Sequence, residues 1–402
     1  LAVFKLFICA DLPRAGEHYL LGGSNMKKLL ALVLSLSLAF SLTACGGGGT
    51  SSSGSAPESG SSTSSEADGE KSFAGVKILH LISNTRGDGG NHDAAAAAVE
   101  KMRDEYGAEI KIVEMGNSAA DVPKYLPTTL DACEEGWDYI VCGTAQMVEP
   151  VMEASNEFPD QKFIVYDAEI VRESEDQYPN VYSCLFKQNE ASFLAGAMAA
   201  QMSDTGKIGF IGGMEIPAIN DFLVGYIDGA RYINPDIEVY SAFVGSWNDV
   251  AKCKEIANTQ YQQGASLVFP AAGQAYPGAF EAGLAAQKMY LGCDVDRSIS
   301  YKETNPEICE YMPTSVLKFV GNSIEGAFLR IMEGENIFGK HETVGIAENC
   351  VGLAENEYYE KLVPEEVRTK LDEIKADIVS GKIVVKSAYG MSQDELNAFK
   401  NA

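Results

Sequence analysis

The sequence predicts two doubly wound α/β lobes with a ligand cleft between them. Short apolar runs that end in Gly or Asp alternate with amphipathic stretches, which is typical of βαβ units and a parallel sheet. This pattern occurs in two sets, separated near residues 181–189. About 330 residues follow a low-complexity N-terminal region, which is more than one core usually serves, so two lobes are expected.

The first set begins with the apolar run Val76–Ile82 and continues with an Ala-rich helix over Asp93–Tyr106. The further strands of this set are predicted at Ile110–Val113, Tyr139–Cys142 and Phe163–Tyr166. The second set has strands at Lys207–Ile211, Glu238–Val244, Leu267–Pro270 and Met289–Gly292.

Ligands of open α/β sheets bind beyond the carboxyl ends of the strands. The segments that directly follow predicted strands are therefore the candidate binding segments. They are Thr85–Asp93, Gly212–Phe222, Gly273–Pro277 and Asp294–Arg297.

The N-terminal region predicts a lipoprotein leader. Met26 and two lysines precede an apolar stretch over 29–42, which is shorter than the ~20 residues that a membrane span needs. Leu42-Thr43-Ala44-Cys45 resembles the lipobox of bacterial lipoproteins, which are cut before the cysteine and lipidated on its sulfur. A buried apolar hairpin that ends in Cys45 is the alternative, but no turn residues or amphipathic period accompany it.

Residues 1–25 show no comparable pattern, so we interpret them as an over-extended gene call, with 26–44 as the signal peptide. The region 45–72 contains the lipidated cysteine and a Gly/Ser-rich tether that lacks the apolar residues needed for a core. The expected location is the extracytoplasmic face of the cell membrane, with the lipid as the anchor.

Charge and motifs exclude several function classes. The net charge of −26 disfavours binding to nucleic acid. Seven scattered cysteines after the tether have no zinc-ligand spacing, and most are interpreted as small buried hydrophobes. The glycine-rich segments match neither a phosphate loop nor a dinucleotide-binding turn, and no catalytic motif is found. No cofactor or metal is expected, and the protein is not predicted to be an enzyme.

The segment 189–266 closely resembles the Bmp (basic membrane protein) family of nucleoside-binding lipoproteins of ABC importers. The resemblance rests on Ser192–Gly196, Thr205–Met214 and Val244–Ser246, and on the later stretches GCDVD and SVLKFV. It is strong over 183–355 and weaker over 73–182. It implies the type I periplasmic-binding-protein fold, in which two α/β lobes close on a ligand. It also implies a first lobe of 73–183 plus about 297–340, and a second of 184–296 plus about 341–402.

The resemblance also implies binding residues, each with an alternative. Asp294 matches an aspartate that accepts ribose hydroxyls, although a helix N-cap would also explain it. Lys318 matches a lysine on the helix 314–332 that returns to the first lobe, against a solvated helix-face lysine. Phe222 matches a base-stacking aromatic, against a core residue. Gly273 matches a glycine that lets ligand approach the backbone, and Trp247 is better explained by packing.

The first lobe departs from the family pattern. The family carries an Asp-Lys-Ser-Phe-Asn stretch, whereas this chain has Asn91-His92-Asp93-Ala94-Ala95, without the stacking Phe. Asn91, His92 and Asp93 remain candidates for hydrogen bonds to a ligand, but Asp93 would also suit a helix cap. Gln146, with its neighbour Met147, is a further candidate for the vacant position.

The leading hypothesis is therefore a lipid-anchored receptor that delivers a nucleoside or nucleoside-like molecule to the permease of an ABC importer. A receptor of the same fold that reports ligand occupancy to a membrane signalling partner is the alternative. Neighbouring permease and ATPase genes would favour the first, and a neighbouring sensor kinase the second. A nucleoside-processing enzyme would need a general acid or base that the sequence does not identify.

Overall fold

A computed structural model describes residues 72–401, except for 88, 117 and 119. The predictions for 1–25, for the leader 26–44 and for Cys45 with its tether up to residue 71 lie outside the described residues. In the part that is described, no helix combines the length and the apolar character that crossing a membrane requires.

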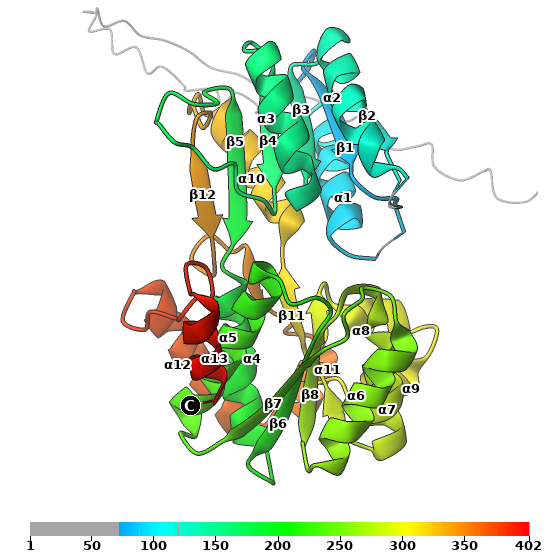
Figure 1. Ribbon diagram of the computed structural model, residues 1–402, viewed down its shortest axis with the longest axis vertical. Helices are drawn as coiled ribbons and strands as arrows, with labels where there is room; N and C mark the ends of the chain where they lie inside the picture. The colour runs from blue at the N-terminus through cyan, green and yellow to red at the C-terminus, as the bar shows by residue number, and fades with distance from the viewer. Residues whose placement is uncertain (1–71, 88, 117, 119, 402) are drawn as a thin grey trace, which may run out of the picture. The chain divides into compact units, whose positions relative to one another are not determined.

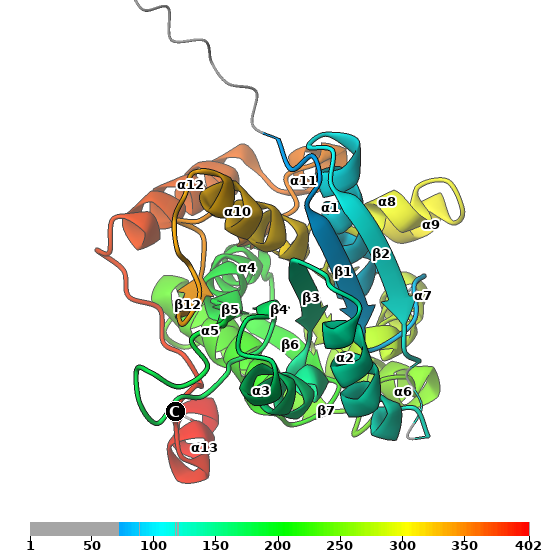
Figure 2. The same cartoon turned by 90° about the horizontal axis from the view of Figure 1, so that it is seen from above.

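The first lobe is a six-stranded parallel sheet in the order β12-β5-β4-β3-β1-β2. Figure 2 shows helices α1 and α10 on one face of this sheet and α2 and α3 on the other. Its strands are β1 (Lys77–Ile82), β2 (Glu109–Glu114), β3 (Tyr139–Gly143), β4 (Lys162–Tyr166), β5 (Val181–Phe186) and β12 (His341–Val344). Its helices are α1 (Asn91–Asp104), α2 (Tyr125–Glu134), α3 (Val148–Glu157) and α10 (Val320–Met332).

The inner strands of this sheet are apolar along nearly their whole length because helices cover both faces. Five of the six residues of β1 and four of the five residues of β3 are buried. The edge strand β2 has no fully buried residue and carries Glu at both ends. These patterns explain why the sequence identifies the inner strands easily.

The second lobe contains a four-stranded parallel sheet, β7-β6-β8-β9, and a three-stranded sheet, β10-β11-β13. The strands are β6 (Lys207–Gly212), β7 (Glu238–Phe243), β8 (Leu267–Ala271), β9 (Met289–Tyr290), β10 (Gly292–Asp294), β11 (Ser315–Lys318) and β13 (Val351–Leu353). The longer helices are α4 (Gln188–Met202), α5 (Pro217–Ile233), α6 (Val250–Gln262), α7 (Pro277–Ala286), α12 (Glu365–Val379) and α13 (Gln393–Asn401). The short ones are α8 (Arg297–Tyr301), α9 (Pro306–Cys309) and α11 (Glu357–Leu362).

The chain crosses between the lobes three times (Figure 1). The crossings lie between β5 and α4, between β11 and α10, and between β12 and β13. Hydrogen bonds hold the three segments side by side: Lys187 N donates to the carbonyl of Val344 at 2.8 Å, and Phe319 N donates to the carbonyl of Cys350 at 2.8 Å.

Four elements differ from their predictions. The residues 297–318 belong to the second lobe, because β11 pairs with β10 and β13, and β12 belongs to the first-lobe sheet. The run Met289–Gly292 is divided between the short strand β9 and the start of β10, in two different sheets. The expected helix over 314–332 begins only at Val320, after strand β11.

The cysteine interpretation is confirmed for six of the seven described cysteines, which are buried free thiols, and Cys133 is half-buried. No disulfide bond constrains the fold in the described part of the chain.

Helices α4 and α5 pack with almost no space between their backbones. A Cβ placed on Gly229 would overlap the carbonyl oxygen of Phe193, and one on Gly196 would overlap the carbonyl oxygen of Tyr226. Gly196 and Gly229 therefore set the distance between α4, which follows the lobe crossing, and α5, which follows strand β6.

We expect Gly229→Ala to lower the free energy of unfolding by about 1 to 3 kcal/mol, because the added methyl group must push the two helices apart. Gly326→Ala is the matched control, since this glycine is also inside a helix and a Cβ there would meet nothing within 4 Å. The control should be neutral or stabilised by up to about 1 kcal/mol, because alanine favours a helix. Denaturant unfolding of the two variants measures the difference, and equal effects would contradict the close-packing argument.

Candidate ligand-binding site

A buried ion pair joins the two lobes. Lys318 at the end of β11 places its Nζ 2.7 Å from Oδ2 and 2.8 Å from Oδ1 of Asp167, which directly follows β4 of the first lobe. Only 5% of the Lys318 side chain and 15% of the Asp167 side chain are exposed. Lys318 therefore lies at the end of a strand and is buried, so its expected place on the helix 314–332 is wrong, and so is the alternative of a solvated lysine on a helix face.

Two aspartates whose charges act on Lys318 stand at strand ends in an unusual backbone conformation. Asp167 has φ +53° and Asp294, the last residue of β10, has φ +68°. Asp tolerates this left-handed region better than most residues, but such positions still store strain and cluster at functional sites. Both carboxylates thus leave their strands at sharp turns.

Asp294 does not cap a helix. The N-cap of α8 is Asp296, whose Oδ1 accepts hydrogen bonds from Ser298 N at 3.0 Å and Ser298 Oγ at 2.7 Å. The cap explanation for Asp294 is therefore wrong. Burial alone would lower the pKa of Lys318, but the carboxylates of Asp167 and then Asp294 outweigh burial and raise that pKa, which keeps the ammonium charged.

Asn91 joins this group from the first turn of α1. Its Nδ2 donates to Oδ2 of Asp167 at 3.3 Å. Its Oδ1 is buried and has no hydrogen-bond partner in the described part of the chain. A buried amide oxygen without a partner is costly, so this atom is a natural acceptor for a donor on a bound molecule.

His92, which follows Asn91, makes its contacts within the first lobe. Nδ1 of His92 lies 3.3 Å from the hydroxyl of Tyr166, which also lies 3.2 Å from Nε2 of His80. Burial, followed by the charges of His92 and Arg86, lowers the pKa of His80 to about 3, so this ring is neutral. His80, Tyr166 and His92 therefore form one buried row of hydrogen-bonding side chains.

Asp93 organises the loop before α1. Its carboxylate accepts hydrogen bonds from Gly87 N and Gly89 N, both at 2.8 Å. The N-cap of α1 is Gly90, so Asp93 holds the preceding loop instead of capping the helix.

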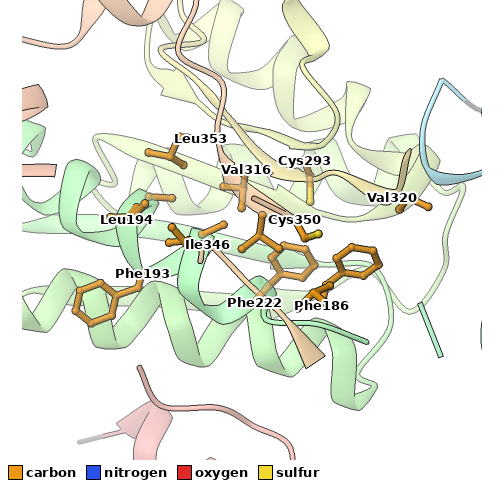
Figure 3. Close-up of a cluster of buried hydrophobic side chains, with 14 of the residues drawn as sticks. Phe186, Phe193, Leu194, Phe222, Cys293, Val316, Val320, Ile346, Cys350 and Leu353 are labelled. Carbon is orange, nitrogen blue, oxygen red and sulfur yellow. The ribbon is translucent and has the colours of Figure 1, made fainter. Parts of the chain in front are cut away.

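Phe222 is part of the core at the lobe crossing. It is 3% exposed, and its ring packs edge-on against Phe269 with 6.0 Å between the centroids. Figure 3 shows Phe222 beside Phe186 of β5, near Cys350 and Val320. Nζ of Lys318 lies 5.4 Å from the Phe186 ring centroid and 6.0 Å from that of Phe222, so both rings make cation–π contacts with the lysine.

Gly273 and Gln146 lie at other strand ends. Gly273 has φ +55°, and a Cβ there would lie 3.0 Å from Trp247 Cε3. Trp247 packs its ring on Gly273 and Gly213, yet 43% of the residue is exposed. Gln146 is exposed beyond β3. In the described residues, no hydrogen bond links Gly273 or Gln146 to the Lys318 group.

The sequence reasoning missed Asp167, and it included Arg297 in a candidate segment without giving it a role. Asp167 follows the apolar strand β4 directly, which is the same signal that identified Asp294. Arg297 is 5% exposed and donates from Nε to Cys293 O at 3.0 Å and from Nη1 to Gly89 O, in the first lobe, at 2.9 Å. Arg297 is thus a second contact between the lobes.

Two open hollows on the surface lie away from this group. One is lined by Arg172, Glu173, Ser174, Glu175 and Gly339, none of which belongs to the Lys318 group. We define the candidate site by the converging polar side chains, because they come from both lobes and from the strand ends where this architecture binds ligands.

Comparison with known proteins gives a consistent match. The profile of the family described as ABC transporter substrate-binding protein PnrA-like (Bmp) matches residues 75–388. Basic membrane protein A of Borreliella afzelii is 28% identical over 77% of this chain and 91% of its own length. The ABC transporter nucleoside-binding protein BmpA of Lactococcus lactis subsp. cremoris is 30% identical over 67% of this chain and 76% of its own.

The fold is also that of solved solute-binding proteins. The crystal structure of an ABC transporter solute-binding protein from Aeropyrum pernix K1 superposes with a TM-score of 0.65 at 25% identity. The alignment covers 81% of this chain and 98% of that one. The predicted type I periplasmic-binding-protein fold is confirmed.

Asp221 is a buried carboxylate close to the site. It is 1% exposed, and its Oδ1 accepts hydrogen bonds from Ser387 Oγ at 2.6 Å and Ala388 N at 2.9 Å. Burial raises its pKa from 3.8 to about 6, although the hydrogen bonds and Lys318 act in the opposite direction. The folded state therefore binds this proton more tightly than the unfolded state does.

It follows that Asp221 contributes stability below about pH 4 and that this contribution is lost as the pH rises through about 6. We expect Asp221→Asn to raise the free energy of unfolding at pH 7.5 by about 1 to 2 kcal/mol, since one pKa unit is about 1.4 kcal/mol and weaker hydrogen bonds offset part of the gain. The gain should shrink at pH 4.5. Asp236→Asn, at an exposed aspartate, is the control for urea unfolding at both pH values. A gain that is equal at both pH values would contradict the raised pKa.

Proposed function

Because the chain belongs to the Bmp family of PnrA-like ABC transporter substrate-binding proteins, we propose that it captures a nucleoside or nucleoside-like small molecule and delivers it to the permease of an ABC importer. The ligand would bind between the lobes, at the group formed by Lys318, Asp167, Asn91 and Asp294. We also propose that a lipid on Cys45 holds the protein at the extracytoplasmic face of the membrane.

The observation that carries this proposal is the convergence of hydrogen-bonding groups from both lobes on Lys318. Asp294 is partly exposed at the end of β10. A carboxylate accepts two hydroxyl donors at once, which suits the vicinal hydroxyls of a ribose. The ammonium of Lys318 has three N–H donors, and it makes two hydrogen bonds to Asp167.

The charges of the site favour a neutral ligand over a phosphorylated one. Lys318 is already neutralised by Asp167, so Asp294 adds a net negative charge close to the pair. A phosphate placed beside Asp294 would meet like charge in a partly buried site. Nucleosides are therefore preferred to nucleotides in this proposal.

The remaining predicted residues keep supporting roles in the proposal. Phe222 would support Lys318 from the core, and Gly273 would let the ligand approach the backbone. His92 and Asp93 would fix the loop and helix end that present Asn91, and Gln146 lies at the neighbouring strand end.

Calorimetric titration with inosine, adenosine, guanosine and uridine tests the proposal. We expect at least one of them to bind, and the corresponding 5′-monophosphate to bind at least tenfold more weakly. Failure of all four nucleosides to bind would contradict the proposed ligand class.

Asp294→Asn should weaken the Kd for the nucleoside that binds by at least tenfold, which corresponds to ~1.4 kcal/mol, because the charged acceptor is lost. The ligand-free melting temperature should change little, since Asp294 caps no helix. Asp296→Asn is the matched control two residues away, because Asn caps a helix nearly as well as Asp. Unchanged affinity in Asp294→Asn would remove this residue from the site.

Cys45→Ala should move the protein from the membrane fraction to the soluble extracytoplasmic fraction without changing nucleoside affinity, because the acyl chains cannot be attached. Mass spectrometry of the N-terminus shows whether the leader has been removed. A processed variant that stays in the membrane fraction would contradict lipid anchoring at this residue.

A further inference from the structure

After α12, the chain packs against α4 and α5, next to the lobe crossing. The segment that leads to α13 lies along α4 and α5 (Figure 1), and α13 contacts α5. Asn189 Nδ2 donates to Lys386 O at 3.0 Å, and Lys386 Nζ lies 2.9 Å from Oδ1 of Asp228. Val224, Ala388 and Leu396 form a small apolar cluster between the segment and α5.

The buried carboxylate of Asp221 fixes this segment just before Tyr389. Asp221 accepts hydrogen bonds from the hydroxyl of Ser387 and from the backbone of Ala388, and it directly precedes Phe222. A hydrogen bond to a charged, buried acceptor is stronger than a neutral one. The backbone that carries Tyr389 is thus held in place from inside the second lobe.

The Tyr389 side chain contacts the first residue of α4, next to the lobe crossing. Its hydroxyl accepts a hydrogen bond from Gln188 Nε2 at 3.3 Å, and Gln188 begins α4 directly after the crossing residue Lys187. Burial is the largest effect that raises the pKa of Tyr389 to about 12, and the charges of Asp167 and Asp221 add to it while Lys318 opposes it. The hydroxyl therefore lies within electrostatic reach of both members of the ion pair.

The exposure of the rings near Lys318 differs sharply. Phe186 is 0% exposed and Phe222 is 3% exposed, whereas Tyr389 keeps 37% of its surface exposed. The buried rings can support Lys318, but they present no free face to a ligand. An exposed ring on a fixed backbone offers a flat apolar surface at little entropic cost.

We propose that Tyr389 forms the aromatic wall of the ligand site and stacks on the base of the bound nucleoside. This inference rests on the proposed function. The residues that match the family profile end at 388, so the match itself assigns no role to Tyr389. The polar group around Lys318 recognises the sugar, and the Tyr389 ring supplies the apolar surface that a planar base needs.

Calorimetry with inosine and with D-ribose tests this assignment on the full-length protein. Tyr389→Ala should weaken inosine binding by about tenfold or more, as expected for the loss of one base–aromatic contact, and should change D-ribose binding by less than about twofold. Tyr389→Phe keeps the ring and should bind inosine within about threefold of the wild type. Tyr232→Ala, which removes a 48% exposed tyrosine from the far end of α5, should change neither ligand.

Thermal unfolding of each variant establishes that the fold is intact. If the wild type binds inosine and Tyr389→Ala binds it equally well, the assignment of Tyr389 is overturned while the proposed function stands. Equal losses for inosine and D-ribose would also overturn base stacking. If the wild type binds no nucleoside, the proposed function fails and this inference fails with it.

Discussion

The buried contact between Lys318 and Asp167 is the interaction around which the candidate site is arranged. It joins the end of β11 in the second lobe to the end of β4 in the first, 151 residues earlier in the chain. A buried ion pair gives weak net stabilisation, because desolvation of two charges offsets much of their attraction. Breaking it by removing one partner is nonetheless destabilising, since the other charge is left buried. The pair therefore contributes more to positioning than to stability. It holds the strand ends of the two lobes together, and the polar side chains beside it are positioned by those strand ends.

The apolar core explains how this geometry is held. The main cluster of buried side chains contains residues of both lobes, such as Ile78 of β1 and Ile208 of β6, and it continues through the crossing at Phe186 and Val320. The hydrogen bonds at Lys187 and Phe319 align the crossing segments beside this cluster. Lys318 and Gln188 are thus placed next to rigid packing, although they come from distant parts of the sequence. Polar groups on such supports lose little conformational entropy when they bind a ligand.

Much of the fold follows from the sequence, because inner parallel strands are almost continuously apolar and end in turn residues. β1, β3, β4 and β6 were predicted within one residue at each end. Tertiary context decided the exceptions: β11 is only four residues long, and Met289–Gly292 is one apolar run that two sheets share. The site was predicted less completely. Asp167 carried the strand-end signal and was missed, whereas no local pattern marks Tyr389, which reaches the site only through the docking of the chain's last segment on α5.

The conformation of the two strand-end aspartates shows what the sequence alone cannot reveal. An Asp after an apolar run predicts the edge of a sheet, but it does not predict that Asp167 and Asp294 both adopt positive φ. That conformation turns the chain sharply at the strand end, so that one carboxylate reaches Lys318 across the lobe boundary and the other remains partly exposed beside it. One carboxylate then holds the lysine, and the other is the one that we propose to bind a neutral, hydroxyl-rich ligand. The division of roles between two chemically identical side chains follows from their partners, and therefore from the fold.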